Sequence, residues 1–137
     1  MPGCTFHASG EAFSVDEFLA ASSLTPYRVY HRGEQNGRGE LWQESGFCVD
    51  VSDEGDDFSA ECREVLHFLQ EFELELSRLG HFPGVTDRRL DFGYFRRDVA
   101  VQCDYLPPEL LALAGALGIG IELSLYPQPV EEDDDDY

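Results

Sequence analysis

The chain has 137 residues and a formal net charge of −19 at pH 7, because 28 acidic residues are balanced by only nine basic ones, all of them arginine. Hydrophobic residues make up 42% of the sequence, which is enough for one core. So acidic a surface repels phosphate backbones and anionic lipids. The charge therefore argues against direct binding to nucleic acids or membranes and favours a basic protein partner.

The first part of the chain combines short strands with one short helix. Residues 4–9 alternate apolar and polar side chains, which predicts a half-buried strand. Ser14 begins a helix with the spacing of a capping box, and a proline ends it. Residues 27–32 and 40–51 are predicted to form the two arms of a hairpin. Gly46 interrupts the second arm and indicates a bulge or a close approach of two backbones.

The longest periodic segment, residues 59–79, predicts one amphipathic helix about 30 Å long. Ser59 is its expected N-cap, and Leu69 and Phe72 should be among the most buried residues of the protein. The apolar row comprises Cys62, Val65, Leu69, Phe72, Leu76 and Leu79, widened by Leu66, Phe68 and Leu74. The solvated row comprises Glu61, Glu64, Glu71, Glu75 and Arg78.

Two further strands, a helix and a last strand are predicted after the long helix. Residues 90–95 and 98–105 are expected to form strands joined by a tight turn. A helix opens at Pro107, and residues 119–126 alternate so regularly that they predict the last strand. The strand at 98–105 should bury the row Val99, Val101 and Cys103.

The predicted order of elements is therefore βαββαββαβ. Hairpins interspersed with helices indicate an α+β two-layer sandwich with a mixed, largely antiparallel sheet and helices on one face, ferredoxin-like in its first part. We expect one globular domain over residues 1–126. A disordered acidic tail should follow over residues 127–137, where prolines and a run of acids provide nothing to build a core.

The sequence contains no recognisable constellation of catalytic or metal-ligating residues. No Cys-x-x-Cys or His-x-x-x-His pair occurs, so we expect neither a metal nor another cofactor. Cys4, Cys48, Cys62 and Cys103 have apolar neighbours and are expected to be core thiols of a protein in the reducing cytoplasm. A cysteine–histidine pair could arise only between distant segments, and its thiol would be unactivated. We therefore expect a protein that is not an enzyme.

Two groups of side chains are candidates for contact with a protein partner. Aromatic residues concentrate in interface hot spots, although the predicted alternative is that they cover the sheet beneath the long helix. The acidic loop before the long helix would attract a basic protein, the alternatives being a calcium site or a purely solvated loop. The candidate partner-binding residues are Tyr30, Trp42, Asp53, Glu54, Asp56 and Asp57.

Pairs of arginines at the two ends of one predicted strand suggest a different use. Arg89 and Arg96 could bracket a small anion, as in a small-molecule or regulatory ligand-binding domain. Neighbouring Asp87, Asp91 and Asp98 give a simpler account, in which the arginines form surface ion pairs.

Several segments resemble a known bacterial family. ASGEAFSVDEFLAASSLTPYRVYHRGE, GELWQES and the closing LPPELLALAGALGIGIELSLY are similar to the domain-of-unknown-function family four-two-seven-nine. The positions that match its patterns are Val15, Asp16, Glu17, Leu24, Pro26, Arg28, Gly33, Glu34 and Trp42. The resemblance covers nearly the whole globular part and supplies no catalytic residues.

The resemblance also implies a function, because related small acidic proteins look like immunity proteins encoded beside secreted bacterial toxins. We therefore expect a non-enzymatic cytoplasmic immunity protein that binds and blocks a cognate basic toxin domain. The alternatives are a small-molecule or regulatory ligand-binding domain and a nucleic-acid mimic that occupies a basic groove.

Overall fold

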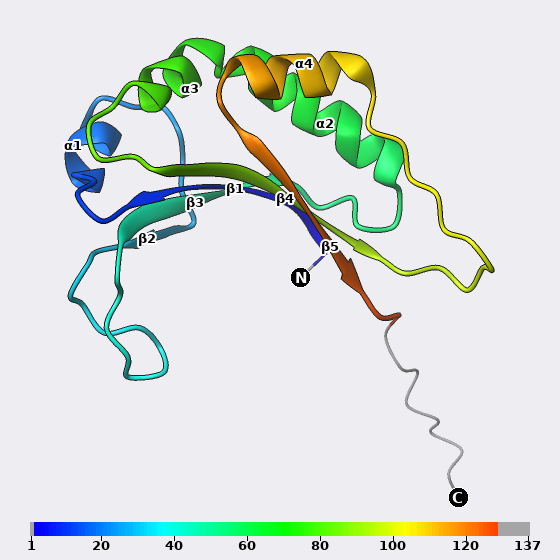
Figure 1. The fold of residues 1–137 in the computed structure, drawn as a ribbon, viewed down its shortest axis with the longest axis horizontal. Helices are drawn as coiled ribbons and strands as arrows, with labels where there is room; N and C mark the ends of the chain where they lie inside the picture. Colours follow the sequence, from blue (N-terminus) through cyan, green and yellow to red (C-terminus); the bar gives the residue numbers. More distant parts are fainter. Residues whose placement is uncertain (1, 129–137) are drawn as a thin grey trace, which may run out of the picture.

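The computed structural model describes residues 2–128 of the chain (Figure 1). These residues form strands and helices in the order βαββααβαβ. The strands are β1 (Gly3–Gly10), β2 (Arg28–Tyr30), β3 (Ser45–Ser52), β4 (Asp87–Phe95) and β5 (Gly120–Tyr126). The helices are α1 (Val15–Ala20), α2 (Phe58–Glu71), α3 (Glu73–Gly80) and α4 (Pro108–Ala116).

The strands form one mixed sheet in the order β2-β3-β1-β4-β5. All neighbours in the sheet are antiparallel except β4 and β5, which are parallel. The order of β4, β1, β3 and β2, with helices between β1 and β2 and between β3 and β4, is the ferredoxin-like part. Helices α2, α3 and α4 lie over one face of the sheet (Figure 1). The predicted α+β two-layer sandwich is thus confirmed.

The helix-bearing face of the sheet holds an aromatic core. Phe6 of β1 and Phe47 of β3 have ring centres 6.2 Å apart, and Phe68 of α2 lies 6.1 Å from Phe6. Phe18 of α1 stacks on Phe47 at 5.8 Å. Burying each such ring stabilises the fold by roughly 1.5–3 kcal/mol, so this cluster fixes the helix layer on the sheet.

The predicted single helix over residues 59–79 is two helices that meet at Phe72. The φ of −105° and ψ of 21° at Phe72 end α2 and begin α3. Leu69 before the junction is fully buried, as predicted, and so is Leu76 after it. The change of direction keeps both apolar rows on the core, while Phe72 itself is only partly buried.

Three residues of this helix pair depart from their predicted places. Asp57, not Ser59, is the N-cap, and its carboxylate accepts a hydrogen bond from Ala60 N at 3.0 Å. Leu74, expected on the apolar side, is 86% exposed because α3 starts in a new direction. Glu61, expected in solvent, is fully buried because the first turns of α2 lie against the sheet.

The prediction of a strand over residues 98–105 is wrong, because this segment is part of the loop that joins β4 to α4. The place beside β4 is taken by β5, which pairs with β4 in parallel after the crossover through α4. The loop is therefore left outside the sheet. Its residues Val99, Val101 and Cys103, predicted as a buried row, are exposed. The other three cysteines are buried, as expected.

The predicted tail lies mostly outside the described residues. Its first two residues, Pro127 and Gln128, are described, and Gln128 Nε2 donates a hydrogen bond to the Arg96 carbonyl at 3.1 Å. This side-chain contact holds Gln128 next to the residue that follows β4. None of the helices in the described part of the chain is long and apolar enough to cross a membrane.

Candidate functional site

The face of the sheet opposite the core is polar and charged. Alternation along the strands places Arg28, Cys48, His7 and Arg89 in one row across this open face, since each lies in register with the next. In Figure 1 the segment between β2 and β3 extends beyond this side of the sheet. The open face and its rim are therefore the places to look for a site.

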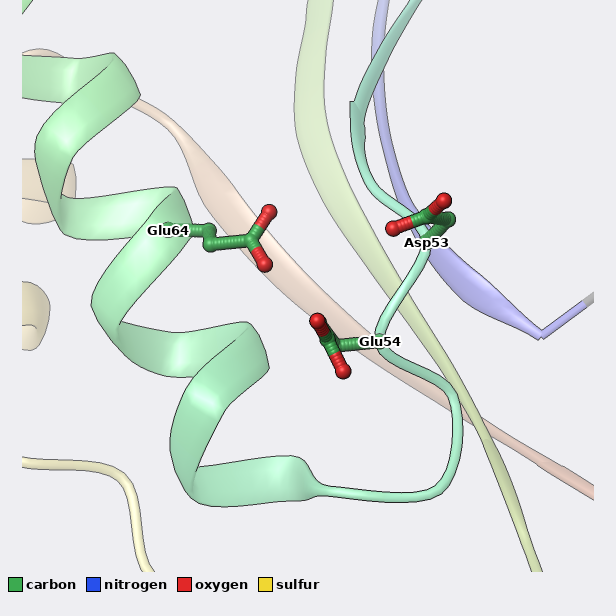
Figure 2. Close-up of side chains that lie close together, drawn as sticks. All are labelled: Asp53, Glu54 and Glu64. Atoms are coloured by element: carbon green, nitrogen blue, oxygen red, sulfur yellow. The ribbon is translucent and has the colours of Figure 1, made fainter.

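Three carboxylates converge at one rim of the sheet. Asp53 and Glu54 follow β3, and Glu64 lies on the exposed face of α2. One carboxylate oxygen from each lies within 4.8 Å of the other two, and all three residues are exposed. Figure 2 shows the loop and the helix directing these side chains toward one another. None of the three forms a salt bridge within residues 2–128. We call Asp53, Glu54 and Glu64 the acidic cluster.

The acidic cluster borders a hollow of about 750 Å³. Asp53 and Glu64 line this hollow, together with Tyr27 just before β2, Arg28 of β2 and Asp50 of β3. Burial of the phenol raises the pKa of Tyr27 above its ordinary value, so this side chain stays neutral at physiological pH. The hollow thus combines carboxylates, an aromatic ring and one arginine.

The aromatic candidates lie next to this hollow. The rings of Tyr30 and Trp42 stack at 4.2 Å with an interplanar angle of 24°. Both line a second hollow of about 610 Å³, which shares Arg28 with the first. The structure therefore brings the aromatic pair and the acidic cluster to adjoining hollows on the β2 side of the sheet.

The surroundings of Trp42 differ from those predicted. Trp42 lies in the loop before β3, which starts at Ser45, and not in a strand. Tyr30 pairs with Gly46 and so lies on the open face, not beneath the long helix. A Cβ at Gly46 would lie 2.5 Å from the Tyr30 hydroxyl and 2.4 Å from the Ala8 carbonyl oxygen. The close approach of two backbones predicted at Gly46 is thus confirmed. The lack of a side chain at Gly46 also leaves the room that the Tyr30 hydroxyl occupies.

The remaining acids of the predicted loop do not join the cluster. Asp57 is occupied as the N-cap of α2, and Asp56 is exposed beside it. The buried Gly55 lies between the two groups, with its carbonyl accepting a hydrogen bond from Phe95 N at 3.2 Å. This anchor directs Asp53 and Glu54 to one side.

The two arginines of the ligand-binding alternative are far apart. Arg89 lies within β4, and its guanidinium contacts Asp87 at 2.9 Å and Glu122 at 3.2 Å. Arg96 follows the end of β4 and is exposed. They are seven positions apart in nearly extended chain, which corresponds to roughly 23 Å. Arg89 thus forms ion pairs with its acidic neighbours, which is the simpler of the two accounts predicted from the sequence.

A cysteine and a histidine from distant segments of the chain lie next to each other on the open face. Cys48 Sγ lies 3.2 Å from His7 Nδ1. Burial raises the pKa of the Cys48 thiol, and burial together with Arg89 lowers the pKa of His7. Both shifts favour a neutral pair in which the thiol donates to the imidazole, which is not the thiolate form of a nucleophile.

The acidic cluster is also the group that could hold a cation in the described part of the chain. Three carboxylates bind a cation through one or both of their oxygens, whereas Ca²⁺ takes six to eight ligands, so water would have to complete the coordination in so exposed a place. The same oxygens could also accept hydrogen bonds from a cationic side chain.

Sequence reasoning missed Glu64 and Asp50 as parts of this site. A signal existed for Glu64, because the sequence pattern places it on the solvated face of the helix, near the loop that precedes the helix. Asp50 has no local signal, since its proximity to Arg28 depends on how β2 pairs with β3.

No family model, no curated protein and no solved structure matches this chain. The resemblance to the domain-of-unknown-function family four-two-seven-nine therefore stays a prediction from the sequence.

Proposed function

We propose that this protein is a non-enzymatic inhibitor that binds a basic protein through the acidic cluster and the two adjoining hollows. The observation that carries this proposal is the convergence of three exposed carboxylates, without an ion pair among the described residues, on the rim of a large hollow. An arginine or lysine of a partner could enter there and contact several carboxylates at once.

Electrostatics favours such a partner for a simple reason. Two unit charges about 5 Å apart in water repel each other by roughly 1 kcal/mol, so the free cluster carries unfavourable pairwise terms that a cation relieves. The net charge of −19 extends the attraction beyond the contact itself. It raises the rate of encounter with a cationic protein, and salt reduces that effect.

The stacked pair Tyr30 and Trp42, which lines the otherwise polar second hollow, supplies the aromatic part of the contact. Tyr30 and Trp42 are partly exposed and are held rigid by their stacking. Rigid aromatic residues lose little conformational entropy on binding and are typical of hot spots. Trp42 is therefore expected to govern the lifetime of the complex, whereas the acidic cluster governs its formation.

The resemblance to immunity proteins and the charge support the further proposal that the partner is a toxin domain. In this proposal the protein acts in the cytoplasm of the cell that makes the toxin. It covers a basic active site or substrate groove, and it needs no catalytic residue of its own.

The experiment that tests this proposal compares two variants with the same change of net charge. In the cluster variant, Asp53→Asn, Glu54→Gln and Glu64→Gln neutralise the acidic cluster. In the control variant, Glu11→Gln, Glu71→Gln and Glu73→Gln neutralise three exposed acids elsewhere. Each protein is used as bait with lysate of the native host, and the bound proteins are identified and their association rates are measured.

We expect one basic protein that binds the wild type and the control variant, and that binds the cluster variant at least tenfold more weakly. Co-expression should also relieve any toxicity of that protein. Equal binding to the cluster variant would contradict the proposal. Recovery of no protein partner, together with saturable binding of a small anion lost in Arg89→Gln, would favour the ligand-binding alternative.

A further inference from the structure

Strand β5 lies at an edge of the sheet formed by residues 2–128. It is seven residues long and pairs with β4 alone in this part of the chain, so every second backbone N–H and C=O along its outer side has no strand partner among the described residues. The opposite edge, β2, is only three residues long. β5 contains neither proline nor lysine, and its pairing with β4 is continuous, without a bulge. Natural proteins usually block such an edge, unless it has an occupant.

The two faces of β5 have different chemistry. Leu123 and Leu125 are in register with Phe92 and Tyr94 on the helix-bearing face, but they are 48% and 52% exposed, whereas their β4 neighbours are buried. A further strand beside β5 would cover these leucines with its own apolar side chains.

The other face of β5 is polar. Glu122 contacts Arg89 at 3.2 Å and is about half exposed. Ser124 donates a hydrogen bond to Asp91 at 2.6 Å. A strand beside β5 would therefore place every second side chain next to Glu122 and near Asp91, where a basic residue is favoured.

Charge decides between the two kinds of occupant. A second copy of this chain would bring two molecules of net charge −19 edge to edge, and its own Glu122 would add a like charge. A basic segment would instead be attracted. We propose that the free edge of β5 binds an extended segment of alternating apolar and basic residues, which joins the sheet as an additional strand. This inference rests on the proposed function in that the segment belongs to the same basic partner.

The test uses a synthetic peptide as long as β5, in which valine and lysine alternate. A control peptide of the same charge has proline in place of its central valine, because proline cannot donate the hydrogen bond that strand addition needs. Binding is measured by calorimetry to four proteins. These are the wild type, the edge variant Leu123→Thr with Leu125→Thr, the surface control Leu111→Gln on α4, and the cluster variant defined above. The substituted leucines are all about half exposed, so these variants should keep the fold, and thermal melting verifies this.

We expect the alternating peptide to bind the wild type, Leu111→Gln and the cluster variant similarly, and to bind the edge variant at least tenfold more weakly. The proline peptide should bind at least tenfold more weakly to all four. Backbone amides on the outer side of β5 should also become protected from hydrogen exchange in the complex.

Three outcomes would overturn the inference: no binding, equal binding of both peptides, or unchanged binding to the edge variant. Loss of peptide binding in the cluster variant alone would show that the basic segment binds at the acidic cluster. This result would agree with the proposed function but would contradict strand addition at β5. Dimerisation of the wild type through β5, detected by sedimentation and lost in the edge variant, would show that the edge binds a second copy of this chain instead.

Discussion

Replacing Glu61 should stabilise the protein in a manner that depends steeply on pH. Glu61 is fully buried, and neither of its carboxylate oxygens has a hydrogen-bond partner within residues 2–128. Burial raises its pKa from 4.5 to about 8, and the charges of Asp91 and Glu64 add to this shift. Cys4 and Cys62, whose thiols are also buried, are too weakly acidic to carry a charge beside it.

The magnitude follows from proton linkage. Below pH 4.5 the carboxyl group is protonated in both the folded and the unfolded chain, so it does not make the free energy of unfolding depend on pH. Between pH 4.5 and about 8 the unfolded chain is ionised while the folded one holds its proton, so stability falls by roughly 1.4 kcal/mol per pH unit. Over the whole window the loss reaches on the order of 3–5 kcal/mol.

The assay is urea unfolding of wild type and Glu61→Gln at several pH values from 4.5 to 9. Glutamine keeps the shape and removes the ionisation, so the two proteins should have similar stability at pH 4.5, and the variant should be more stable by several kcal/mol at pH 9. Glu71→Gln, an exposed residue at the end of α2, is the control and should follow the wild type. If the free energies of unfolding of Glu61→Gln and wild type changed with pH in the same way, the burial of an unpaired carboxyl group at this position would be refuted.

Two further predictions follow from the fold. Leu69→Ala should lower the free energy of unfolding by about 2–5 kcal/mol, whereas Phe72→Ala should lower it by no more than about 2 kcal/mol because its ring is only partly buried. Chemical denaturation measures both values, and a larger loss for Phe72→Ala than for Leu69→Ala would contradict this prediction. Hydrogen bonds that His31 donates to the carboxylates of Asp16 and Glu34 raise its pKa above 6.5, so an NMR titration should find a pKa that falls in Asp16→Asn. The stability that these contacts supply is full below pH 6.5 and is lost as the pH rises through the raised pKa, and an unchanged titration would contradict the contact.

Local periodicity predicted those elements whose environment repeats along the chain. The strand over residues 4–9 buries Cys4, Phe6 and Ala8, as alternation predicts, because β1 is central and only one of its faces meets the helices. The same reasoning failed at residues 98–105. Their alternation is as good locally, but β5 occupies the place beside β4, and only the whole topology decides which of two candidate strands pairs there.

Helix faces show a similar limit. The 3.6-residue period assigned Leu69 correctly, yet it placed Glu61 in solvent, because the period of a helix does not reveal how widely its first turn is covered by the sheet. The candidate site was half predictable. Asp53 and Glu54 follow from residue type and loop position, and Tyr30 and Trp42 follow from residue type. Glu64 joins the two acids only when α2 turns back over the loop.

The central claim is that the acidic cluster recruits a basic protein, and the most direct measurement is the association rate of the recovered partner as a function of salt. Attraction between opposite charges reaches about 10 Å at 0.1 M ionic strength and less at higher salt. Wild type should therefore associate more slowly as salt rises, and the cluster variant should show both a lower rate at low salt and a shallower salt dependence than its charge-matched control. Identical salt dependence for the cluster variant and its control would contradict the account.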